Sequence, residues 1–219
     1  MTLPNMEKIE SSIVLLSGTK TSLNLSGEAL SKVVRDPVVQ GVGQPGQTPV
    51  RINVTSLPDQ IVITLVEDRF IFEDKSDDSP TTGKLPDAVH RFIGMLDEQN
   101  AATIRAYGLN FKLAFDARGD NSASEVIAER YVDVSKLNER GGISVRGAGL
   151  RLYYDHSSGA KCELMVEPLG TPDAPRFAAK VNYHFDLPDG KMPPLETVKT
   201  SYLGLWPQFQ ELMDKLFVK

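Results

Sequence analysis

Residues 176–186 read Arg176-Phe177-Ala178-Ala179-Lys180-Val181-Asn182-Tyr183-His184-Phe185-Asp186, and this stretch decides the fold class. Apolar and polar side chains occupy alternate positions, which is the period of a β-strand. One predicted face carries Phe177, Ala179, Val181, Tyr183 and Phe185, and the other carries Arg176, Lys180, Asn182, His184 and Asp186. A strand with one apolar and one polar face predicts an antiparallel sheet that is covered on a single side.

The same alternation occurs in the preceding part of the chain. Residues 103–116 form a predicted strand with an inward set of Tyr107, Leu109, Phe111, Leu113 and Phe115. Two further strands, 143–155 and 160–167, flank the turn at 156–159. The second half of the chain therefore predicts an antiparallel sheet built from sequential strands.

Helices are predicted where the apolar period changes to that of a helix. Residues 85–100 and 195–217 each carry an apolar stripe, and Ser122 with Glu125 forms a capping box that starts a short helix at 125–131, within a helical stretch 122–138. A weaker helix is predicted at 26–34. Pro207 removes a backbone hydrogen bond, so we expect the last helix to break near Trp206.

The predicted elements occur in the same order twice. The first half contains a strand at 9–16, the helix at 26–34, strands at 50–55, 60–66 and 69–73, and the helix at 85–100; the second half repeats this order. We predict an α+β protein with a single domain over residues 1–219 and two similar β-α-β-β-β-α halves, 1–100 and 101–219. One curved antiparallel sheet with helices packed on one face follows from this order.

This order of elements resembles the duplicated arrangement of the TATA-binding protein family. The resemblance is confined to the order of elements, because no motif of that family is present. The acidic balance of the chain also argues against the DNA binding of that family. The sequence therefore assigns no family.

The strands of the first half differ from those of the second, because both of their faces are apolar. Residues 61–66, Ile-Val-Ile-Thr-Leu-Val, and residues 13–16, Ile-Val-Leu-Leu, show no alternation. A half-exposed strand does not carry such a pattern unless the second face is covered. Loops, the N-terminal helix or a partner subunit are the alternatives, and we expect a homodimer.

Composition excludes several classes of protein. The chain is 41% hydrophobic and 24% charged, with a net charge of −5, so it is globular and has no basic surface for nucleic acid. Cys162 is the only cysteine, which excludes an internal disulfide and suits a reducing compartment. No secretion leader and no stretch of about 18 apolar residues is evident, so we expect a soluble, cytoplasmic protein that does not bind membranes.

Two glycine-containing motifs are only weak evidence for nucleotide or phosphate binding. Gly41, Gly43 and Gly46 match the dinucleotide-binding pattern, but prolines lie within and after it and a strand follows instead of a helix. The segment Gly18-Thr19-Lys20-Thr21 lacks the adjacent glycine and lysine of a phosphate-binding loop. We interpret the first as a loop and the second as a turn, and we expect no cofactor.

One polar surface remains as a candidate site. The residues predicted to share it are Arg151, Tyr153, Lys180, Asn182, His184 and Asp186. His184 and Asp186 could share a metal or form a pair, but no third ligand is evident, so an ordinary solvated face is the stronger interpretation.

The remaining reactive residue types indicate no catalytic group. We expect Cys162 to be buried, His90 to lie at the edge of an apolar stripe and His156 to lie in a turn. We expect no catalytic residue and no metal. The leading hypothesis is a non-catalytic interaction or structural protein that self-associates through the apolar first-half surface and could also bind another protein. The alternative is a small-ligand binder or enzyme that uses the polar face around His184 and Asp186.

Overall fold

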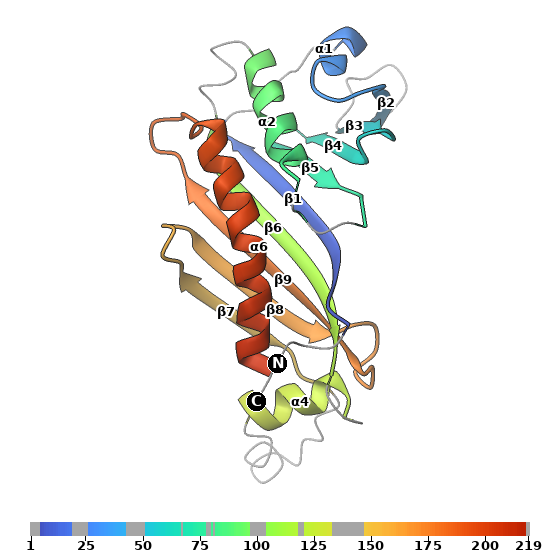
Figure 1. Cartoon of the computed structure of the whole chain (residues 1–219), viewed down its shortest axis with the longest axis vertical. Helices are drawn as coiled ribbons and strands as arrows, with labels where there is room; N and C mark the ends of the chain where they lie inside the picture. The colour runs from blue at the N-terminus through green and yellow to red at the C-terminus, as the bar shows by residue number, and fades with distance from the viewer. Residues whose placement is uncertain are drawn as a thin grey trace.

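A single sheet runs through both halves of the chain. The computed structural model describes residues 5–18, 26–42, 51–66, 68–77, 80, 82–96, 104–117, 121–132 and 147–217. These residues form a nine-stranded antiparallel sheet in the order β2-β3-β4-β5-β1-β6-β9-β8-β7, with the helices on one face (Figure 1). The predicted α+β class is confirmed.

The bounds of the elements follow the predicted order closely. The strands are β1 (Glu7–Ser17), β2 (Val38–Val42), β3 (Arg51–Ser56), β4 (Ile61–Val66), β5 (Arg69–Asp74), β6 (Ile104–Asp116), β7 (Leu150–Asp155), β8 (Lys161–Pro168) and β9 (Arg176–Asp186). The helices are α1 (Gly27–Ser31), α2 (Lys84–Met95), α4 (Ala123–Tyr131) and α6 (Leu195–Phe217). The strand predicted from 143 begins only at Leu150, with residues 147–149 irregular. Residues 50, 97–100, 103, 133–138 and 143–146 of predicted elements lie outside the described residues.

The two halves meet at the central pair of strands, β1 and β6. From β1 the sheet continues through β5, β4, β3 and β2, and from β6 it continues through β9, β8 and β7. The halves therefore correspond strand for strand, except that the first has the additional edge strand β2. The sequence does not predict this strand, because it is short and contains Gly41, which belongs to the predicted glycine-rich loop.

Aromatic side chains fill the space between the sheet and the two long helices. In the first half, the Phe92 ring of α2 lies 5.1 Å from the Phe70 ring and 5.3 Å from the Phe72 ring. In the second half, the Trp206 ring of α6 lies 5.7 Å from the Phe111 ring. Burial of these rings holds the helices on the sheet, because each buries a large apolar area.

The final helix does not break, so the prediction of an interruption near Trp206 was wrong. Helix α6 continues from Leu195 to Phe217 with Pro207 inside it. Tyr202 and Trp206 before the proline and Phe209 after it are all buried, while Pro207 is exposed. Packing on both sides of Pro207 compensates for the hydrogen bond that it cannot donate.

The short helices pack on the same side of the sheet as α2 and α6. Leu30 of α1 is buried with Val33 and Val34 just beyond it, and Arg91 of α2 donates a 2.8 Å hydrogen bond to the Val33 carbonyl. Helix α1 thus does not cover the second face of the first-half strands, which excludes one of the three alternatives for that cover.

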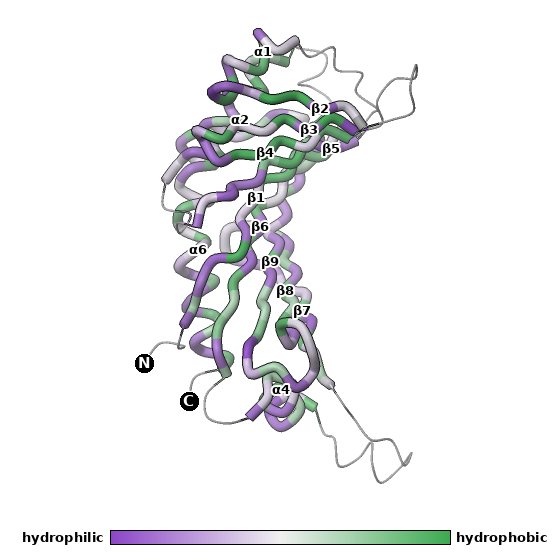
Figure 2. Tube along the Cα trace, turned by 90° about the vertical axis from the view of Figure 1, so that its right-hand side faces the viewer, coloured by the Kyte–Doolittle hydropathy of each residue, from purple (hydrophilic) through white to green (hydrophobic). Residues whose placement is uncertain are grey.

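Helix α4 begins at the predicted capping box of Ser122 and Glu125, which is confirmed. It contacts the C-terminal end of α6, where the Tyr131 hydroxyl donates a 2.6 Å hydrogen bond to the Leu216 carbonyl. Figure 2 shows α6 along one side of the sheet, with none of the described helices on the other side. No helix among the described residues is long and apolar enough to span a membrane.

Candidate binding surface on the open face of the sheet

We call the side of the sheet away from the helices the open face. Strand pairing sets which side chains lie on it, because paired residues point to the same side. Tyr153 pairs with Glu163, Glu163 with Asn182, and Asn182 with Asn110. The candidate residues Arg151, Tyr153, Lys180, Asn182, His184 and Asp186 all lie on this face.

Most charged groups of these six residues are neutralised by neighbours. Asp186 accepts a 2.7 Å hydrogen bond from Lys161 and lies 3.0 Å from the Nε2 atom of His184. The hydrogen bond from Lys161, followed by that from His184, lowers the pKa of the Asp186 carboxyl. Arg151 pairs with Glu163, and its guanidinium lies 5.2 Å from the centre of the Tyr153 ring. This arrangement matches the interpretation of a solvated face with cross-strand ion pairs.

Two features near the centre of the open face could not be recognised from the sequence. The Oδ1 atom of Asn182 is buried and accepts no hydrogen bond from the described residues. It lies beside Gly108, where an added Cβ atom would be only 3.1 Å from that oxygen. The alternation places both residues on this face, but the close approach depends on the pairing of β6 with β9.

Apolar side chains gather on the open face of the first half. Val14 of β1 pairs with Ile71 of β5, and Val62 and Val66 of β4 lie on the same face. We call Val14, Leu16, Val62, Val66 and Ile71 the apolar patch. All five are partly exposed. The predicted second apolar face is thus present on the open side of the first-half strands, and none of the described helices covers it.

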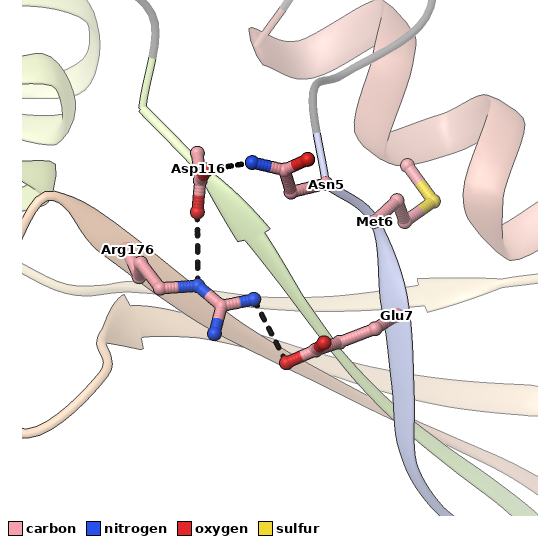
Figure 3. A pocket seen from close by; sticks show the side chains of 5 residues that line it. All are labelled: Asn5, Met6, Glu7, Asp116 and Arg176. Carbon is pink, nitrogen blue, oxygen red and sulfur yellow. Dashed lines mark hydrogen bonds and ion pairs between the residues drawn. The ribbon is translucent and has the colours of Figure 1, made fainter. Parts of the chain in front are cut away.

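An open cleft of about 460 Å³ lies at another place, where β1 begins and β6 ends (Figure 3). Arg176 lies between two carboxylates there, 2.8 Å from Glu7 and 2.9 Å from Asp116. Asn5 donates a hydrogen bond to Asp116, and Met6 completes the lining. Because Arg176 is already paired with two acids, the cleft presents no free cation to an anionic ligand. None of the six candidate residues lines it.

A charged pair that the sequence did not indicate is buried on the helix side. The Nζ atom of Lys8 lies 3.0 Å from the Asp74 carboxylate, and the two side chains are only 2% and 7% exposed. Ser76 donates a 2.7 Å hydrogen bond to the same carboxylate. Nearby, the Tyr202 hydroxyl of α6 donates a 2.9 Å hydrogen bond to Ser11. This cluster satisfies its own polar groups, and it is structural in character.

The other reactive residue types lie as expected. Cys162 is buried, and burial raises the pKa of its thiol to about 11, which makes it a poor nucleophile. His90 is exposed on α2, and His156 lies beside the turn that precedes β8, with its ring 5.5 Å from that of Tyr183.

The glycine motifs do not form a phosphate site among the described residues. Gly41 lies within β2, whereas Gly43, Gly46 and residues 19–21 lie outside the described residues. In the part of the chain that the structure describes, no three His, Cys, Asp or Glu side chains are placed to hold a metal ion.

Comparison with known proteins identifies no relative by sequence. No family model matches the chain, and no curated protein matches it. Among solved structures, Methanococcus jannaschii TBP aligns with 94% of this chain and 99% of its own at 8% identity, with a TM-score of 0.32.

Proposed function

We propose that this protein is a non-catalytic interaction module that self-associates through the apolar patch on the open face of its first half. The observation that carries the proposal is the placement of all described helices on one face, which leaves the apolar patch partly exposed on the other. Exposed apolar clusters of this kind favour contact with another macromolecule, because burying them removes apolar surface from water.

The surroundings of the apolar patch support a second copy as the partner. Arg69 and Glu73 lie at opposite ends of β5 on the same open face as Ile71. A two-fold axis that crosses β5 would set Arg69 of one copy against Glu73 of the other, around an apolar centre. An apolar centre with a charged rim is the usual composition of a homodimer interface.

The proposal is tested by placing a charge in the apolar patch. Val62→Asp should lower the mass in solution, because a carboxylate buried between two apolar surfaces has no partner. Val39→Asp is the matched control, since Val39 is 44% exposed on the other side of edge strand β2. Size exclusion coupled to light scattering measures the mass, and thermal melts verify that both variants fold.

Two outcomes would contradict self-association through the apolar patch. One is a parent protein with the mass of a single chain at micromolar concentration. The other is a folded Val62→Asp variant with the same mass as the parent and Val39→Asp.

A second candidate function is a small-ligand site on the polar second-half part of the open face. The buried, unpaired Oδ1 atom of Asn182 favours it, because a ligand could donate a hydrogen bond to that atom. In this case His184→Ala, two positions from Asn182 on the same face of β9, should lower the melting temperature of the purified protein, because it removes a side chain beside the ligand. An unchanged melting temperature in His184→Ala argues against this function.

A further inference from the structure

Among the described residues, no segment pairs with or covers the outer side of β7, the edge strand of the second half. β7 is the last strand of the sheet and pairs on its inner side with β8, without a register shift. Leu152 is 37% exposed and Tyr153 is 69% exposed, so the edge presents large side chains on both faces.

Natural sheets usually protect such an edge with proline, charged side chains of one sign, above all lysine, a bulge or a covering segment. The sequence of β7, Leu-Arg-Leu-Tyr-Tyr-Asp, contains no proline or lysine, its pairing has no bulge, and its two charged residues, Arg151 and Asp155, are of opposite sign. Its two tyrosines are of a residue type that is enriched in strands. An edge with these properties is suited to receive another strand.

The backbone groups that point outward can be identified from the neighbouring turn. The amide of His156 donates a 2.8 Å hydrogen bond to the Ala160 carbonyl, which continues the pairing of β7 with β8. In an antiparallel pair, alternate residues direct their N–H and C=O groups to the same neighbour. Residues 150, 152 and 154 therefore bond to β8, and Arg151, Tyr153 and Asp155 direct theirs outward.

We infer that β7 pairs with β7 of a second copy, antiparallel, with Tyr153 opposite Tyr153 at the two-fold axis. This register sets Arg151 of one copy against Asp155 of the other, twice by symmetry, and both side chains lie on the open face. On the helix face it sets Leu152 against Tyr154. The outward N–H and C=O groups of Arg151, Tyr153 and Asp155 then satisfy one another across the contact.

The charged side chains favour this register over registers that are shifted by two or four residues. A shift of two residues in either direction places Arg151 or Asp155 opposite Tyr153 and removes the ion pairs. A shift of four residues sets Arg151 against Arg151 or Asp155 against Asp155, which is repulsive. The strand is thus complementary to itself in a single register, and this is why a second copy is the partner that fits it.

Both charged groups are accessible for this pairing. Arg151 is held on the open face by Glu163 and stays 57% exposed, so its guanidinium retains free donors for Asp155. Asp155 is exposed, and its interactions with the described residues are electrostatic effects on Lys161 and Cys162. In the contact, Asp155 would lie between Lys161 of its own copy, with which it pairs across β7 and β8, and Arg151 of the second copy.

A charge-swap experiment tests the contact. Arg151→Asp and Asp155→Arg should each weaken association at least about tenfold, because each sets like charges opposite one another. The double variant Arg151→Asp/Asp155→Arg should recover it, since the swapped pair is again complementary. Lys180→Asp is the control, as it reverses a charge on the open face of β9, away from the edge. Dissociation constants come from sedimentation equilibrium.

Tyr153→Pro provides a second test that does not depend on charge. It removes an outward N–H group and no hydrogen bond to β8, so the chain should fold and lose the edge contact. Val62→Asp should leave this contact intact, which separates it from association through the apolar patch. The inference is overturned if neither single charge variant weakens association, if the double variant fails to recover it, or if folded Tyr153→Pro associates as the parent does.

Discussion

At the scale of single residues, the buried pair of Lys8 and Asp74 departs most from what the sequence predicts. If side chains alternated strictly along β1, Ile9 would lie on the helix side of the sheet together with Ile13 and Ser11. The pairing of β1 with β6 instead shifts register between Lys8 and Glu10. Ile9 is 41% exposed as a result, and Lys8 lies on the helix side. A bulge of this kind leaves no mark in the hydrophobic pattern, so sequence reasoning could not find this cluster.

We predict that Asp74→Asn lowers the free energy of unfolding by about 3 to 5 kcal/mol, because it leaves Lys8 charged, buried and unpaired. Asp68→Asn is the matched control, since Asp68 is 58% exposed and pairs with Arg69 at the surface. That change should cost no more than about 1 kcal/mol. Urea unfolding measures the free energy of unfolding of both variants. Equal, small losses in the two variants would show that Lys8 is solvated when Asp74 is neutral.

For the candidate site, the sequence predicts which residues share a face but not which of their atoms interact. Alternation along β9 placed Asn182 and His184 on one face correctly, because the strand is regular throughout its length. It could not reveal the unpaired Oδ1 atom of Asn182, nor the salt bridge between Lys161 and Asp186. These depend on distances across strands, which are set by register and not by composition.

At the scale of elements, α6 shows that tertiary packing can override a local signal. Pro207 predicts a break, yet its ring is exposed and the buried side chains on either side hold one continuous helix. The reverse case is β2, where local signals were too weak to predict a strand. Its residues form a strand because β3 offers a free edge, which is information that the segment itself does not contain.

We predict that Pro207→Ala stabilises the protein by about 1 to 3 kcal/mol, because alanine restores the backbone hydrogen bond and removes the clash with the preceding turn. Gln208→Ala is the control, since Gln208 is the next exposed position of the same helix. It should change stability by no more than about 0.5 kcal/mol. Thermal and denaturant melts compare the two variants. A destabilised Pro207→Ala would mean that the proline shapes α6 to fit the sheet.

At the scale of the whole molecule, the pairing of the central strands β1 and β6 joins the two halves and favours their unfolding as one unit. These strands pair over most of their length, from Glu7 with Ala114 to Ser17 with Ile104. Helices α2 and α6 are also linked at the surface by a 2.7 Å ion pair of Asp87 with Lys199. The sequence predicts a single domain with two similar halves, and an uninterrupted sheet of this kind favours cooperative unfolding.

Whether the two halves unfold together can be measured with a fluorescent probe in the second half and a mutation in the first half. Trp206, the only tryptophan, packs on Phe111 in the second half, whereas Ile63 is fully buried in β4 of the first. Ile63→Ala should cost about 2 to 5 kcal/mol through the cavity that it leaves. If the chain unfolds as one domain, the midpoint seen by Trp206 fluorescence moves as far as that seen by circular dichroism. A Trp206 midpoint that stays at the parent value would instead show that the halves unfold separately, in spite of the strand pair that joins them.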